Sequence, residues 1–226
     1  MRNALAGIAG TIEVLEQTPL WRPLPDEVSE EVGVQIARIA DSVNDLITYG
    51  RPPGLNLVRC DVHKILDQVI AAASGASRTP RAPRAPTVQT IRRYADGPLW
   101  AEVDSVRLQQ AFHNLLANAH QAMGSVGQLT ITTRSNGAGV EICFTDTGTG
   151  MNPETLARAF EPFYTTKAKG TGLGLPIVKT IVDAHKGSID LESAPREGTT
   201  VRLRLPAAPA AVGAGSAARR SGSSAA

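Results

Sequence analysis

The stretch DTGTGMNPETLARAFEPFYTTKAKGTGLGL, residues 146–175, decides the fold of this chain. It contains two glycine-rich segments, 146–151 and 169–175. The first follows residues 140–145, whose apolar side chains alternate as in a β-strand, and the second precedes residues 176–184, which are expected to form a helix. Glycines allow a close backbone approach, and the free N–H groups of a helix N-terminus favour anions. The stretch therefore predicts a phosphate-binding loop that leads into a helix.

A helix with two amide side chains on one face is expected just upstream of these segments. Asp104 is a suitable N-cap for a helix that runs to Met123, and this helix contains QQAFHNLLANAHQAM. Asn114 and Asn118 are four residues apart, so they share a face, while Leu115 and Leu116 point toward the core. A solvated surface explains such a pair equally well when it is taken alone. Its neighbourhood favours a ligand-facing role.

The surrounding sequence predicts a mostly antiparallel sheet covered by helices. Alternating runs at 128–134, 140–145, 188–192 and 200–205 are typical of strands, and a helix is expected from about residue 62. Asp96-Gly97 favours a hairpin turn between strands at 87–94 and 99–103. Residues 74–86 are expected to form a solvated loop. The glycine-rich segments are neither a Walker loop nor a dinucleotide fingerprint, so a different nucleotide-binding fold is required.

A helical hairpin is expected at the start of the chain and a tail at its end. Apolar stripes at 5–15 and 28–47 are separated by prolines, and RPPG at 51–54 ends the second stripe. Residues 1–52 would bury their stripes by pairing with a second copy into a four-helix bundle. Packing against the following domain is the alternative. Residues 207–226 are too poor in large apolar groups to fold.

Composition excludes several classes of protein. The net charge is +2 over 226 residues, which indicates neither a nucleic acid nor an anionic membrane as a binding partner. Cys60 and Cys143 form no metal or redox motif, so a reducing cytoplasm is expected. No apolar run reaches the length of roughly 18 residues that crosses a bilayer. The four histidines lack zinc-ligand spacing and are expected as surface or helix-capping residues.

The order of motifs resembles the ATP-binding domain of two-component sensor histidine kinases. The series is the Asn114 and Asn118 helix, DTGTGM at 146–151, FEPFYTTK at 160–167, KGTGLGL at 169–175 and EGTT at 197–200. The resemblance covers residues 55–206, and MRNALAGI with the YGRPP hinge resembles the dimerisation segment of that family. It implies an α+β protein in which a helical hairpin precedes a two-layer α/β sandwich of the GHKL type.

The resemblance also implies a role for each motif residue. Asn118 would bind Mg²⁺ with support from Asn114, Asp146 would accept a hydrogen bond from the adenine amino group, and Thr199 would assist through water. Phe160 and Phe163 would anchor a mobile segment from about Tyr164 to Thr171. Gly148 and Gly150 would make room for the base, and the phosphates of ATP would be held by Lys167, Gly170, Thr171, Gly172, Leu173, Gly174 and Leu175.

Two departures from the family pattern affect the expected activity. Gln121 stands where many relatives place a phosphate-contacting Lys or Arg, so that role is not assigned to it. Met1-Arg2-Asn3-Ala4-Leu5 matches the family's phosphoacceptor motif only from its third position, so the acceptor histidine would precede Met1. The implied activity is phosphoryl transfer from ATP to that histidine and then to an aspartate of a response-regulator receiver domain.

Two other functions remain open. One is a dimerising ATP-binding module without catalysis, and the other is an ATP hydrolase or clamp of the GHKL type. Hydrolase relatives usually carry Glu where this chain has Asn114, and an amide cannot act as a general base toward water. This difference favours the kinase.

Overall fold

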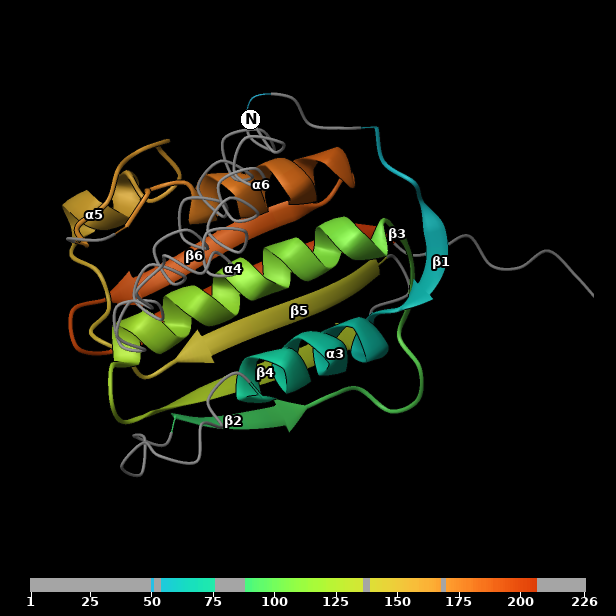
Figure 1. Cartoon of the computed structure of the whole chain (residues 1–226), viewed down its shortest axis with the longest axis horizontal. Coiled ribbons are helices and arrows are strands. Elements are labelled where there is room, and N and C mark those ends of the chain that lie inside the picture. The colour runs from blue at the N-terminus through green and yellow to red at the C-terminus, as the bar shows by residue number, and fades with distance from the viewer. Residues whose placement is uncertain (1–49, 51–53, 76–87, 136–138, 168–169, 207–226) are drawn as a thin grey trace, which may run out of the picture.

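The computed structural model describes residue 50 and residues 54–75, 88–135, 139–167 and 170–206. The expected helical hairpin at 1–52, most of the loop at 74–86 and the tail at 207–226 lie outside these residues. The described part is a two-layer α/β sandwich in which helices cover one face of a sheet (Figure 1).

The main sheet has five strands in the order β2-β4-β5-β7-β6. Three of its four pairings are antiparallel, and β2 pairs with β4 in parallel. A mostly antiparallel sheet was the prediction, and it is confirmed. The strands are β2 (Val88–Arg93), β4 (Gly127–Ser135), β5 (Gly139–Asp146), β6 (Ser188–Ala194) and β7 (Gly198–Pro206).

The predicted hairpin around Asp96-Gly97 is wrong. Gly97 does turn the chain at a φ of 73°, but the two flanking strands separate. β2 joins β4, whereas β3 (Trp100–Val103) pairs with β1 (Val58–Asp61) in a second, two-stranded sheet. The residues on the buried side of β3, Ala101 and Val103, are fully buried there. Burial of this strand against the main body therefore outweighs local hairpin pairing.

Three helices pack on the same face of the main sheet (Figure 1). They are α3 (Val62–Gly75), α4 (Ser105–Met123) and α6 (Gly174–Ala184), and a short helix, α5 (Pro153–Ala157), lies beside them. The expected helices starting near residue 62 and at Asp104 are confirmed. Fully buried side chains from helices and sheet, among them Leu66, Phe112, Ile142, Ile177 and Leu203, form the core.

Asp104 begins α4 as the sequence predicts. Its Oδ1 accepts hydrogen bonds from the backbone N–H groups of Val106 and Arg107, both at 3.1 Å, and its Oδ2 accepts one from Asn56 at 3.1 Å. Burial by itself would raise the pKa of this carboxyl, but the three N–H donors together outweigh it, and the pKa is lowered. Asp104 thus joins the segment before β1 to the helix that carries both asparagines.

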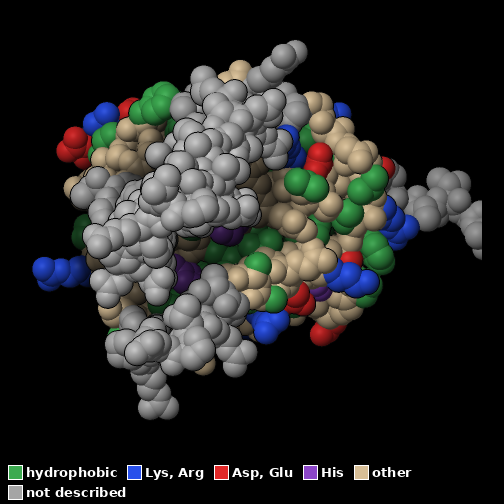
Figure 2. Space-filling model, viewed as in Figure 1, with side chains coloured by type: hydrophobic (Ala, Val, Ile, Leu, Met, Phe, Trp, Pro, Cys, Tyr) green, Lys and Arg blue, Asp and Glu red, His purple; other side chains and the backbone are tan. Residues whose placement is uncertain are grey.

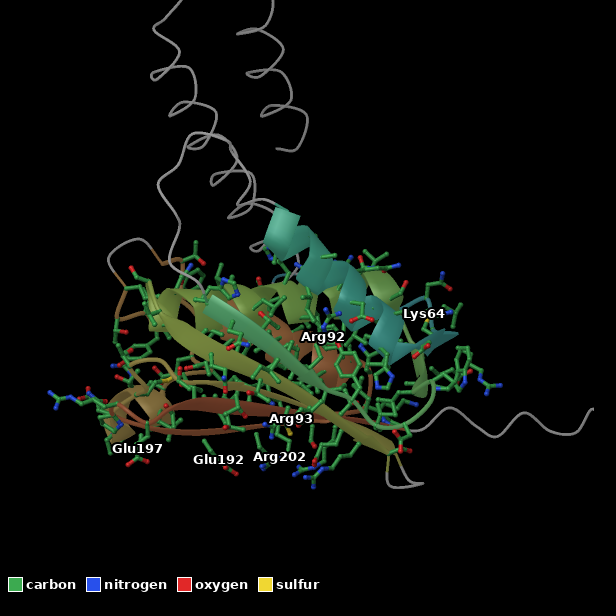
Figure 3. The ribbon with its side chains drawn as sticks, turned by 90° about the horizontal axis from the view of Figure 1, so that it is seen from below. Lys64, Arg92, Arg93, Glu192, Glu197 and Arg202 are labelled. Carbon is green, nitrogen blue, oxygen red and sulfur yellow. The ribbon has the colours of Figure 1, made fainter. Side chains whose placement is uncertain are left out.

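The other face of the sheet carries charged side chains. Arg93, Glu192 and Arg202 point away from the helices, whereas Arg92 lies on the side of α3 (Figure 3). Arg92 forms an ion pair with Asp67 of α3 at 2.9 Å, and Arg202 pairs with Glu192 at 3.0 Å. On the helical face, basic and acidic side chains are interspersed over the part that the structure describes (Figure 2).

Candidate functional site

A cavity of about 550 Å³ opens between α4, the ends of β5 and β7, and the chain that leads into α6. This size lies within the range of ligand-binding pockets. Most of the residues predicted to bind ATP line it: Asn114, Asn118, Asp146, Gly150, Lys167, Gly170, Thr171, Gly172, Gly174, Leu175 and Thr199. The fold therefore brings together motifs that are as far apart as 85 positions in the sequence.

Two predicted residues do not line this cavity. Leu173 is buried in the core, with 2% of its surface exposed. Gly148 packs closely against α4, because a Cβ there would collide with Ala122 of α4 and with the Asp146 carboxylate. The absence of a side chain lets the loop after β5 lie directly against α4.

Asp146 is the last residue of β5 and lines the cavity, and only 7% of the residue is exposed. Its Oδ1 accepts a hydrogen bond from the N–H of Gly148 at 2.8 Å. Burial raises the pKa of this carboxyl, while the N–H groups of Gly148 and Thr199 and the charge of Lys167 act in the opposite direction. A half-satisfied, buried carboxylate is a strong acceptor for an N–H donor of a ligand.

Ser193 of β6 does not line the cavity but contacts two residues that do, Met151 and Thr199, and no sequence motif marks it. Its Oγ accepts from the N–H of Met151 at 2.9 Å and donates to the carbonyl of Gly198 at 2.8 Å. It also lies 3.0 Å from the Thr199 Oγ1. Thr199 faces Asp146 across the β5–β7 pairing. Ser193 lies in an ordinary strand pattern, so no local signal could have identified it.

The two asparagines of α4 also line the cavity. Asn114 donates from Nδ2 to the carbonyl of Gly174 at 3.5 Å, which connects α4 to the first residue of α6. Asn118 Oδ1 accepts from Nζ of Lys167 at 3.0 Å. A cation therefore already contacts the oxygen that was predicted to bind Mg²⁺.

The start of α6 suits an anion. Its N-cap, Leu173, provides no side-chain hydrogen bond to the first turn. Uncapped N–H groups and the helix dipole at such a terminus favour phosphate. Gly172 has a φ of 69°, and a Cβ there would collide with the backbone of Phe163. Glycine is thus required where the chain turns into the helix.

Phe163 does not anchor the segment that follows it. The residue is 62% exposed and its φ is 65°. The contact is made by its backbone instead, because the N–H of Phe163 donates to the carbonyl of Gly172 at 3.0 Å. Phe160 is half-buried. The expected anchoring role of Phe163 is corrected accordingly, since the left-handed backbone turns its ring away from the domain.

Comparison with known proteins matches residues 103–209 to the family described as histidine kinase-, DNA gyrase B-, and HSP90-like ATPase. Sensor histidine kinase ZraS of Klebsiella oxytoca is 34% identical over 214 residues, covering 91% of this chain and 44% of that protein. This chain contains a histidine-kinase ATP-binding domain. Sporulation kinase C of Bacillus subtilis is 30% identical over 207 residues, covering 91% of this chain and 46% of its own length.

Solved structures agree with this assignment of the histidine-kinase domain. The catalytic domain of histidine kinase ThkA superimposes with a TM-score of 0.60 at 26% identity, covering 67% of this chain and 96% of its own. Full-length ShkA, solved in complex with AMPPNP, gives a TM-score of 0.75 at 25% identity, covering 93% of this chain and 44% of ShkA. The chain spans less than half the length of the curated relatives named above.

The histidine-kinase domain uses ATP, as its family does. One amide oxygen of the kind that suits Mg²⁺, Asn118 Oδ1, accepts a hydrogen bond from the Lys167 ammonium. Among the described residues, no group of three or more His, Cys, Asp or Glu could hold a metal by itself. Within the same residues, no helix has both the length and the apolar character needed to cross a membrane.

Proposed function

We propose that this chain binds magnesium-ATP in the cavity and transfers its γ-phosphoryl group to a histidine, from which it passes to an aspartate of a response regulator. The observation that carries the proposal is that one cavity is lined both by the buried carboxylate of Asp146 and by Asn118 with the Lys167 ammonium bound to it. A carboxylate suited to a base and an amide oxygen suited to a cation thus share one pocket, on β5 and α4 respectively.

Asp146 would accept a hydrogen bond from the exocyclic amino group of adenine, with Thr199 assisting at the same edge. The carboxylate is buried and fixed by Gly148, so it is preorganised for a neutral N–H donor. Magnesium, when bound, would neutralise phosphate charge, and Asn118 is the residue that would hold it.

The triphosphate would lie along the glycine-rich segment toward α6. The uncapped N-terminus of α6 and the ammonium of Lys167 both favour negative charge. Gly170, Gly172 and Gly174 line the cavity and leave the backbone accessible. Catalysis would then rest on positioning and electrostatic stabilisation of the transferred group.

The acceptor histidine and the partner belong to the same proposal. We expect residues 1–52 to form the dimerisation hairpin, residues 55–206 the catalytic domain and residues 207–226 a tail. A structural relative, ThkA, has been solved in complex with response regulator protein TrrA. This supports a response regulator as the partner. A homodimer is expected from the proposed hairpin at residues 1–52.

Hydrolysis of ATP is the less favoured activity. Asn114 takes the position where hydrolase relatives carry Glu, and its amide donates to the Gly174 carbonyl. An amide in this role cannot remove a proton from water. A chain extended by His-Glu before Met1 should form an acid-labile phosphoprotein from labelled ATP, and Asn118→Ala should abolish the label. Steady ATP turnover without labelling would instead favour the hydrolase.

A further inference from the structure

The Lys167 ammonium is held by two side chains of α4. Its Nζ donates to Asn118 Oδ1 at 3.0 Å and to Gln121 Oε1 at 2.7 Å. The two amides are three residues apart and so share one face of the helix. The shorter of the two hydrogen bonds is the one to Gln121, so Gln121 holds the ammonium together with Asn118.

This ammonium supplies the positive charge of the cavity. Among the described residues that line the cavity, Lys167 is the one Lys, Arg or His. An ammonium has three N–H donors, and the amides of α4 engage two of them. The third is available to an anionic oxygen. Lys167 is otherwise exposed, so without Gln121 only the hydrogen bond to Asn118 would restrain the ammonium and it would sample more positions.

We propose that Gln121 is a positioning residue that holds the Lys167 ammonium against the oxygen of Asn118, where it stands in the place of the metal ion until magnesium-ATP binds. The proposal rests on the proposed function of the site. Asn118 presents one amide oxygen, and that oxygen cannot serve an ammonium and a divalent cation together without bringing two positive charges side by side. Lys167 must then leave Asn118 when the metal enters, and Gln121 can retain it beside the phosphates.

This arrangement predicts how ATP affinity depends on the metal. Without metal, the positioned ammonium is the cation that the phosphates meet, so ATP should still bind. With magnesium present, part of the binding free energy goes into moving Lys167 away from Asn118. The ratio of the Kd for ATP in EDTA to that in Mg²⁺ therefore reports the role of the ammonium, and a general loss of structure would leave this ratio unchanged.

The test is a titration of the intact chain with ATP, in EDTA and in Mg²⁺, for the wild type, Lys167→Met, Gln121→Met and the double variant. Lys179→Met, on the exposed side of α6, is the matched lysine control. Lys167→Met should weaken binding in EDTA by roughly tenfold, the value of one charged hydrogen bond, and less in Mg²⁺. Gln121→Met should raise the Kd ratio in the same direction by a smaller factor.

The double variant separates positioning from an independent effect. If Gln121 acts through Lys167, Gln121→Met should have no further effect on the ratio in the Lys167→Met background. An unchanged ratio in Gln121→Met, or an effect that persists undiminished in the double variant, would overturn the proposal while leaving ATP binding intact. Failure of the wild type to bind ATP even with Mg²⁺ would remove the proposed function itself, and this proposal with it.

Discussion

The backbone N–H of Asp104 donates a hydrogen bond to Nε2 of His185 at 2.9 Å, which ties the start of α4 to the end of α6. Since Nε2 accepts, the ring proton lies on Nδ1 and is donated to the Ile181 carbonyl at 2.8 Å. His185 is 4% exposed. The two helices that wall the cavity are therefore joined at their far ends through one neutral imidazole.

Replacing His185 should destabilise the domain without direct damage to the nucleotide site. His185→Leu leaves the part-buried N–H of Asp104 without this acceptor, so the free energy of unfolding should fall by about 1–3 kcal/mol. Urea denaturation measures this change. His113→Ala, at an exposed position of α4, is the control and should stay within about 0.5 kcal/mol of wild type. Equal effects of the two substitutions would contradict the structural role of His185.

Substitutions of Asp104 should lower the stability of the fold in proportion to the number of hydrogen bonds that each one removes. Asp104→Ala loses the cap of α4 and the contact with Asn56, at a cost of about 1–2 kcal/mol. Asp104→Asn keeps one oxygen for the cap and should fall between Ala and wild type. Thermal unfolding at neutral pH tests this order, and an Asn variant no better than Ala would argue against the capping geometry.

Gly172→Ala should impair both stability and ATP binding. The positive φ of Gly172 disfavours alanine, and the added Cβ meets the Phe163 backbone, so the turn into α6 must shift. Gly54→Ala is a matched control, because a Cβ at Gly54 has no heavy atom within 4 Å. We expect a loss of more than about 1 kcal/mol of stability at Gly172 and almost none at Gly54. Calorimetric unfolding with and without ATP distinguishes the two.

Much of the fold could be predicted because hydrophobic periodicity is local. The helices after Val62 and Asp104 and the strands on both sides of Asp146 follow from it. The pairing of the strands cannot be derived from local periodicity. The Asp96-Gly97 turn forms, yet β2 and β3 pair with strands from distant parts of the sequence. The partner of a strand depends on which faces can be buried together, and no turn dipeptide contains that information.

The candidate site could likewise be predicted in its motif residues but not in their side-chain partners. Motif order predicted that Asn118, Asp146 and the glycines belong to one site, because each motif has its own short pattern, and most of them line one cavity. Side-chain partners could not be predicted: Ser193 gives no signal in a plain strand, and the contact between Lys167 and Gln121 joins residues 46 positions apart. Such contacts depend on tertiary packing, which brings distant segments of the chain together.

The charge of Asp146 should make stability depend on pH in a defined direction. Because burial raises its pKa in the folded state, the ionised carboxylate destabilises the fold at neutral pH, and protonation relieves this cost as the pH falls. Asp146→Asn removes the charge and keeps an acceptor for Gly148. The variant's stability relative to wild type should therefore be greatest at neutral pH and decline toward pH 4. A constant or opposite trend in chemical denaturation would refute this electrostatic cost.

The most direct test of the nucleotide site compares ATP with inosine triphosphate, whose base carries an oxygen in place of the amino group, in calorimetric titrations with Mg²⁺. Wild type should prefer ATP by about tenfold or more, because Asp146 can only accept at that position. In Asp146→Asn, whose amide can also donate, the preference should vanish or reverse. An Asp146→Asn variant that keeps the wild-type preference for ATP would contradict the assignment of this cavity as the ATP site.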